Sequence, residues 1–209
     1  MRVLMIAPPG AGKGTQGALI AAHFKVPHIA TGDLLRAHVA RHTHLGQAVK
    51  QYLERGELVP DEIVLDMVRL AVIAAKDAGQ GYVLDGIPRN MAQARATYTI
   101  VHELGMTANV ALHLIAEDQE LVRRLVARAS LEGRADDTES VIRRRLTLYK
   151  EVTHPILAWY AERGILLSVD AMPPAEQVGQ EILGALEAMR PLVDGVPDRL
   201  SSLSAQRRS

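Results

Sequence analysis

The chain contains no cysteine among its 209 residues. This excludes disulfide bonds and metal sites built on thiolates, and it fits a protein of a reducing compartment. The chain also lacks a net charge, because 24 Lys and Arg residues balance 24 Asp and Glu residues. Overall charge therefore favours no particular class of partner.

Long hydrophobic runs are missing as well, and no stretch approaches the length of a membrane span. The first apolar run, Val3 to Ala7, is too short for the core of a signal peptide. Hydrophobic residues still make up 48% of the chain, enough for an ordinary globular domain. We therefore expect a cytoplasmic protein with one folded domain, bound to neither membranes nor nucleic acids.

Short apolar segments alternate along the chain with longer segments of helical periodicity. The first, residues 2–7, is continuously apolar after Arg2, as in a strand buried on both faces. Strand-to-helix alternation predicts an α/β fold with a mostly parallel sheet covered by helices. We predict strands at 2–7, 28–30, 81–85, 109–115 and 165–169, and helices at 13–24, 61–78, 91–104, 118–129, 138–163 and 175–188.

The alternation of strands and helices is interrupted at Pro155 and again from Pro191 onward. Pro155 falls inside the predicted helix 138–163 and should kink or end it near Thr153, because proline lacks the backbone N–H. From Pro191 onward the periodicity gives way to Pro, Ser, Gly and Arg. We expect a folded core over residues 1–190 and a flexible tail over 191–209.

A glycine-rich loop joins the first predicted strand to the first predicted helix and reads APPGAGKGTQ over residues 7–16. Glycines lack the Cβ atoms that would keep a polyphosphate away from backbone N–H groups. The positive end of the following helix and the ammonium group of Lys13 also favour an anion there. The predicted phosphate contacts are Gly10, Ala11, Gly12, Lys13, Gly14 and Thr15.

This loop resembles that of the adenylate kinase family of nucleoside monophosphate kinases. TGDLLR (31–36), GELVP (56–60) and DGIPR (85–89) match other segments of that family in order and spacing. The resemblance covers residues 1 to about 190. It implies a P-loop NTPase-like parallel sheet of about five strands with helices on both faces, a mobile NMP-binding segment at 31–60 and a short lid at 129–137.

The same resemblance implies an enzyme that moves a phosphoryl group reversibly from Mg·ATP to AMP, giving two ADP. Arg36 and Arg89 would hold the acceptor phosphate, because a planar guanidinium binds a phosphate through two hydrogen bonds. Gln93 would read the edge of the base, and Asp85 with Thr15 would organise waters around Mg²⁺. The implied AMP-binding residues are Thr31, Arg36, Glu57, Val59, Gly86, Arg89 and Gln93.

On the donor side, Arg124 and Arg128 lie four residues apart and therefore share a helix face. By resemblance, Arg124 stacks on the donor adenine near Ala171, and Arg128 reaches the ATP phosphates. Arg134 and Arg145 would contact the transferred phosphoryl group, whose spreading charge such cations stabilise. Arg123, Arg143 and Arg144 are expected to be solvated. The implied catalytic residues are Lys13, Asp85, Arg89, Arg134 and Arg145.

Only five residues separate Arg128 from Arg134, as in the short-lid form of the family. The long form sometimes holds zinc through cysteines, and a chain without cysteine cannot form such a site. No general base is required, because the attacking phosphate oxygen is already largely ionised near neutral pH. Alignment of the substrates and electrostatic stabilisation then account for catalysis.

Three alternatives remain open at this stage. A UMP/CMP kinase shares the short lid, and Asn90 is associated more with that branch, whereas Gln93 favours AMP. A P-loop kinase for a small metabolite such as shikimate would not need the acceptor segments. A nucleotide-binding protein without turnover is the third, since Ala7 and Ala171 stand where the family usually has Gly. We expect a monomer.

Overall fold

The computed structural model describes residues 1–132 and 138–194, and the side chains of 130–132 and 190–194 are not described. A five-stranded sheet lies at its centre, in the order β2-β3-β1-β4-β5. All strand pairs are parallel. This confirms the predicted α/β fold. The strands are β1 (Arg2–Ile6), β2 (His28–Ala30), β3 (Tyr82–Asp85), β4 (Val110–Ile115) and β5 (Leu166–Asp170).

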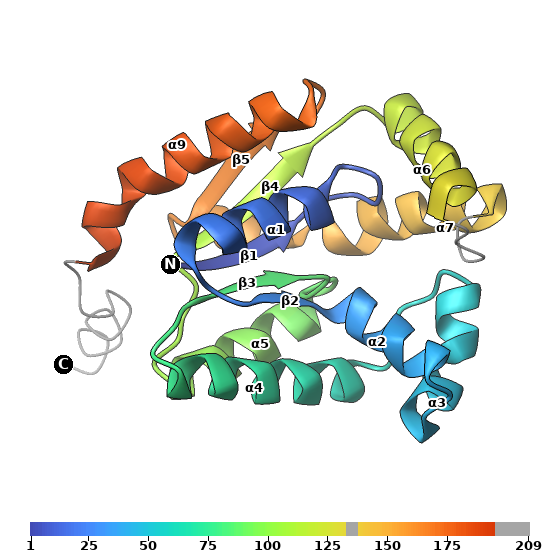
Figure 1. The fold of residues 1–209 in the computed structure, drawn as a ribbon, viewed down its shortest axis with the longest axis horizontal. Coiled ribbons are helices and arrows are strands. Elements are labelled where there is room, and N and C mark those ends of the chain that lie inside the picture. Colours follow the sequence, from blue (N-terminus) through green and yellow to red (C-terminus); the bar gives the residue numbers. More distant parts are fainter. Residues whose placement is uncertain (133–137, 195–209) are drawn as a thin grey trace.

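Helices cover both faces of the sheet (Figure 1). Their bounds are α1 (Lys13–Phe24), α2 (Thr31–Ala40), α3 (His44–Glu54), α4 (Asp61–Asp77), α5 (Met91–Glu103), α6 (Asp118–Glu132), α7 (Glu139–Leu148), the π-helix η1 (Tyr149–Thr153), α8 (Ile156–Ala161) and α9 (Ala175–Asp194). Within the described part of the chain, none of these helices is long and apolar enough to span a bilayer.

The alternation of side chains along β1 divides the core into two parts. Leu4 and Ile6 point to one face and pack with residues of α4, α5 and α8. Val3 and Met5 point to the other face and pack with residues of α1, α6 and α9. All four side chains are at most 4% exposed. β1 is therefore apolar after Arg2 because both of its faces are covered.

The C-terminal ends of the strands meet at one edge of the sheet, where β1 lies between β3 and β4. Ligands of open α/β sheets bind outside this edge, at the position where the strand order reverses. The loop after β1, the segment after Asp85 at the end of β3, and the segment after β5 all start here. In Figure 1, α2 with α3 and α6 with α7 flank this same end of the sheet.

Helices α2 and α3 were not predicted from the sequence, whereas the break expected at Pro155 near Thr153 is confirmed. Pro155 divides the expected single helix into α7, η1 and α8, and His154 N–H donates to the carbonyl of Tyr149 five residues back. The π-helical turn accommodates the ring, which would clash with an α-helical carbonyl. Two other helices are longer than expected: α6 runs to Glu132 and α9 to Asp194. Residues 191–194 thus belong to a helix, whereas the rest of the expected tail lies outside the described residues.

Candidate active site

The glycine-rich loop wraps around the start of α1. Gly10 and Gly12 have φ angles of +87° and +88°, a region that other residues rarely adopt. A Cβ atom on Gly10 would also lie 3.0 Å from the carbonyl oxygen of Leu121. Gly12 is the N-cap of α1 and carries no side chain to occupy the helix end. The first N–H groups of α1 therefore face the cleft, as an anion site requires.

Lys13 reaches back over this loop, and its Nζ donates a hydrogen bond of 3.0 Å to the carbonyl of Ala7. Removal from water lowers the pKa of Lys13, and the positive charges of Arg89, Arg128 and Arg145 act in the same direction. Asp85 opposes them. Because the three arginines disfavour the positive charge of Lys13, a polyanion placed among them would offset this repulsion.

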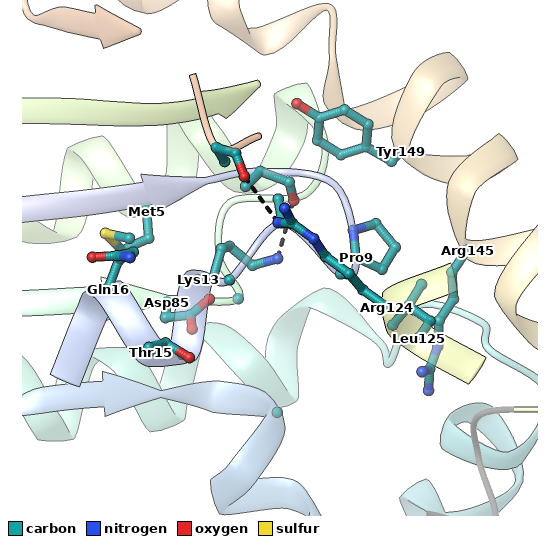
Figure 2. A pocket seen from close by; sticks show the side chains of 18 of the residues that line it. Met5, Pro9, Lys13, Thr15, Gln16, Asp85, Arg124, Leu125, Arg145 and Tyr149 are labelled. Carbon is teal, nitrogen blue, oxygen red and sulfur yellow. Dashed lines mark hydrogen bonds between the residues drawn. The ribbon is translucent and has the colours of Figure 1, made fainter. Parts of the chain in front are cut away.

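Asp85 ends β3 and is 8% exposed. Burial opposes its ionisation, but the nearby imidazole of His28 and the positive charges of Lys13 and Arg89 prevail and hold the pKa of Asp85 below its usual value. His28 Nε2 lies 3.8 Å from Asp85 Oδ2. Figure 2 shows Lys13, Thr15 and Asp85 together on one side of the cleft, with Arg124 and Arg145 on the other.

Arg89 is held at several atoms. Its Nε donates to the carbonyl of Gly86 at 2.7 Å, and its backbone N–H donates to Gln93 Oε1 at 2.8 Å. The hydroxyl of Thr153 donates to the Arg89 carbonyl at 2.7 Å, so η1 also supports this residue. Arg89 lines the main cleft together with Arg36. Arg36 itself forms an ion pair with Asp33 on the same helix.

A small cavity of about 20 Å³ adjoins the main cleft, and the two share Gly86 and Arg89. Thr31, Val59 and Gln93 line this cavity. Its volume suits about one water molecule, so a nucleobase would require the surrounding side chains to move apart. Gln93 is 2% exposed, and both ends of its amide already contact protein groups, Arg89 N–H and Asp61.

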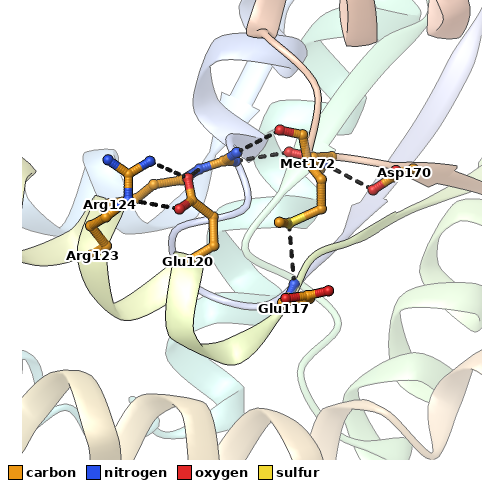
Figure 3. Close-up of polar contacts among 7 residues, drawn as sticks. Glu117, Glu120, Arg123, Arg124, Asp170 and Met172 are labelled. Atoms are coloured by element: carbon orange, nitrogen blue, oxygen red, sulfur yellow. Dashed lines mark hydrogen bonds and ion pairs between the residues drawn. The ribbon is translucent and has the colours of Figure 1, made fainter.

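On the opposite wall, Arg124 is fixed by hydrogen bonds at three of its nitrogens (Figure 3). Its Nε donates to Glu120 at 2.6 Å, and its terminal nitrogens donate to the carbonyls of Ala171 and Met172 at 2.9 and 3.2 Å. The guanidinium plane is thereby held still beside the segment that follows β5. A flat cation in a fixed position is suited to stacking on an aromatic base.

The main cleft, of about 1150 Å³, brings most of the predicted site residues together. Those that line it are Ala171, Arg36, Glu57, Asp85, Gly86, Arg89, Arg124, Arg128, Arg145 and the loop residues from Gly10 to Thr15. Thr31, Val59 and Gln93 line the adjoining cavity instead. Arg134 lies outside the described residues. The roles of all these residues stay predictions.

The arginines that the sequence assigns to solvent are indeed exposed. Side-chain exposure is 77% for Arg123, 68% for Arg143 and 53% for Arg144. Arg144 nevertheless forms an ion pair with Glu57 at 2.8 Å, which links α7 to the segment expected to bind the acceptor. Such exposed pairs contribute little to stability.

Several residues that support the site were not predicted from the sequence. His28 contacts Asp85, Asp61 contacts Gln93, and Thr153 contacts Arg89. The residues of each pair are far apart in the sequence: Asp61 and Gln93 are separated by 32 residues, and Arg89 and Thr153 by 64. Hydrophobic periodicity, which is a local pattern, cannot predict such contacts. Asp61 had one available signal, since it directly follows the GELVP segment.

A buried polar pair lies beneath the cleft. His113 of β4 is 8% exposed, and its Nε2 lies 2.9 Å from the hydroxyl of Tyr149, which lines the cleft. Burial lowers the pKa of His113 to about 4, and His154 acts in the same direction. The folded protein therefore holds His113 neutral over a pH range in which the unfolded chain protonates it.

This shift predicts a loss of stability in mild acid. Protonation of His113 favours the unfolded chain as pH falls from about 6.5 toward 4, and it has no effect above that range. We expect the melting temperature to fall between pH 7 and pH 5, and to fall less in His113→Gln, which keeps a polar partner for Tyr149. The exposed His44→Gln is the control. If the melting temperature falls equally in the parent protein, His113→Gln and His44→Gln, a group other than His113 causes the loss of stability.

Comparison with known proteins gives a consistent result. A sequence model of the adenylate kinase family matches residues 5–165. The adenylate kinase of Thermobifida fusca is 44% identical over 188 residues, which cover 90% of this chain and 99% of that protein. Those of Kocuria rhizophila and Thermus thermophilus are 44% and 41% identical, over 89% and 88% of this chain and 98% and 96% of their own lengths.

Proposed function

Because the chain belongs to the adenylate kinase family, we propose that its cleft aligns Mg·ATP and AMP and transfers the terminal phosphoryl group between them. The chain is an ATP:AMP phosphotransferase, and the reaction is reversible and yields two ADP. The observation that supports the residue assignments best is the set of cations around one cleft. Arg89, Arg128 and Arg145 all act on Lys13 there, and Asp85 is a counter-charge to Lys13 and Arg89.

In this proposal the phosphates of ATP lie on the first N–H groups of α1 and against Lys13. Arg124, already fixed by Glu120 and two carbonyls, carries the donor adenine beside Ala171. Arg36 and Arg89 hold the phosphate of AMP. The acceptor oxygen then attacks the terminal phosphorus of ATP, and ADP leaves with the electron pair of the broken P–O bond. Arg145 and Arg134 stabilise the charge that spreads over the transferred oxygens.

The family uses ATP with Mg²⁺, and this chain offers suitable groups for the ion. No cluster of three or more His, Asp or Glu side chains that could hold a metal occurs in the described ranges. Mg²⁺ commonly keeps several waters and binds substrate phosphates with few protein ligands. Asp85, held ionised, and the hydroxyl of Thr15 both line the cleft and would orient such waters. The ion would neutralise charge on the phosphates. The absence of cysteine excludes a cysteine-based zinc site in the lid.

We also propose that residues 31–60 and the short lid at 129–137 close over the bound substrates. Both segments belong to the proposed kinase core of residues 1–190. The small size of the cavity beside Gln93 supports movement around the acceptor site, because a base does not fit there as it stands. Closing would exclude water, which otherwise competes with the acceptor phosphate.

The acceptor preference is tested by comparing kcat/KM for AMP, CMP, UMP and GMP at saturating Mg·ATP. We expect AMP to be preferred, and its preference over UMP and GMP to arise because a buried amide that matches one base leaves polar groups unpaired with another. We expect Gln93→Ala to reduce the preference by about tenfold or more. A parent protein that prefers UMP or CMP would be a pyrimidine nucleotide kinase. An unchanged preference in Gln93→Ala would place specificity in pocket shape instead.

A further inference from the structure

The Gln93 amide is held in one orientation by two partners of opposite hydrogen-bonding character. Its Oε1 accepts from the backbone N–H of Arg89 at 2.8 Å, and its Nε2 donates to Asp61 Oδ1 at 2.7 Å. A backbone N–H can only donate, and an ionised carboxylate can only accept. Turning the amide over would set donor against donor and acceptor against acceptor, and both bonds would be lost.

Asp61 also orients a second amide in the same network. Asn90 Nδ2 lies 3.3 and 3.4 Å from the two oxygens of Asp61, and Asn90 Oδ1 accepts from the backbone N–H of Gln93 at 2.7 Å. Asn90 is thereby the N-cap of α5, the helix that carries Gln93. The carboxylate thus fixes both the start of this helix and the side chain that faces the small cavity.

Each end of the Gln93 amide has one hydrogen-bonding position left. The nitrogen retains a second N–H, and the oxygen retains a second lone pair. Gln93 lines the small cavity together with Arg89, which would bind the acceptor phosphate. A base tethered to that phosphate cannot slide along the amide to exchange partners. It must therefore present a donor to the oxygen and an acceptor to the nitrogen.

We propose that Asp61 is a specificity-determining residue, which selects acceptor bases with a 6-amino group on a purine or a 4-amino group on a pyrimidine by fixing the orientation of Gln93. Adenine and cytosine place an amino group beside an unprotonated ring nitrogen and match the fixed amide. Guanine, hypoxanthine and uracil place a carbonyl beside a ring N–H and do not match. Asp61 acts through Gln93 and is a positioning residue. The inference rests on the proposed function, since it assumes that the base of a nucleoside monophosphate enters this cavity.

The sharpest test compares AMP with IMP, which differ only in whether the base carries the 6-amino or the 6-oxo group. We expect the parent protein to prefer AMP by about a hundredfold or more in kcat/KM. In Asp61→Ala the amide keeps only its Arg89 partner, and we expect the AMP-to-IMP ratio to narrow by about tenfold or more. Asp61→Asn retains an acceptor oxygen, so its ratio should stay close to that of the parent.

Glu62→Ala is the matched control, because Glu62 is an exposed acidic residue in the same first turn of α4. The Glu62→Ala substitution removes the same charge but no contact with Gln93, so we expect the ratio of kcat/KM for AMP to that for IMP to stay unchanged. Melting temperatures of all variants separate misfolding from altered selectivity. An equal fall in kcat/KM for AMP and IMP in Asp61→Ala would overturn the inference, as would an Asp61→Asn ratio as low as that of Asp61→Ala. A parent that phosphorylates neither nucleotide would instead refute the proposed function.

Discussion

Replacement of Lys13 by methionine is expected to lower kcat by at least about a hundredfold while leaving the fold intact. Methionine has a similar length but cannot place a positive charge among the phosphates. In the structure the ammonium touches only the Ala7 carbonyl among hydrogen-bonding partners within the described chain, so little structural support is lost. The loss should therefore fall on the transition state, where negative charge moves between the two nucleotides.

The measurement is steady-state kinetics with both substrates, together with thermal unfolding. Lys76→Met is the control, because Lys76 is an exposed lysine in the last turn of α4 and does not line the cleft. Near-normal turnover in a folded Lys13→Met protein would show that this loop does not bind the phosphate donor.

Removal of Arg145 is expected to have a comparable effect on the same phosphoryl-transfer step. Arg145 lies in the last turn of α7 and lines the cleft opposite Lys13 (Figure 2). If it contacts the phosphoryl group in flight, Arg145→Ala should lower kcat by about a hundredfold or more and leave both KM values almost unchanged. We expect the same of Arg134→Ala.

Arg143→Ala provides the comparison, since Arg143 is on the same helix but is exposed and pairs with Glu139. We expect its kinetics to resemble those of the parent. If Arg145→Ala raises only the KM for ATP, then Arg145 binds the donor in the ground state and the assignment to the transition state is wrong.

The fold was predictable wherever one local cause determines the structure. β1 is apolar after Arg2 because it is covered on both faces, and α1 starts directly after Gly12. The break at Pro155 follows from a missing N–H and a steric clash. α3 was not predicted. It also carries Gly46, whose absent Cβ allows close packing against the carbonyl of His38, a contact that no local pattern reveals.

The sequence predicted which residues line the cleft better than it predicted the hydrogen bonds that hold them in place. Motifs located Lys13, Asp85 and Arg89, because each belongs to a continuous segment with its own chemistry. Gln93 was expected to read the edge of a base, but its hydrogen bonds to Arg89 and Asp61 were not predicted. Such contacts depend on how α4 packs against α5. The sequence pattern of one segment does not predict how it packs against a distant one.

The central claim is that the cleft exchanges a phosphoryl group between two nucleotides rather than between a nucleotide and water. The most direct measurement supplies only ADP and Mg²⁺ and follows the products by ³¹P NMR. The account predicts equal amounts of ATP and AMP, with no inorganic phosphate, and loss of the reaction in Lys13→Met. Release of phosphate without AMP, or no reaction at all from a folded protein, would contradict it.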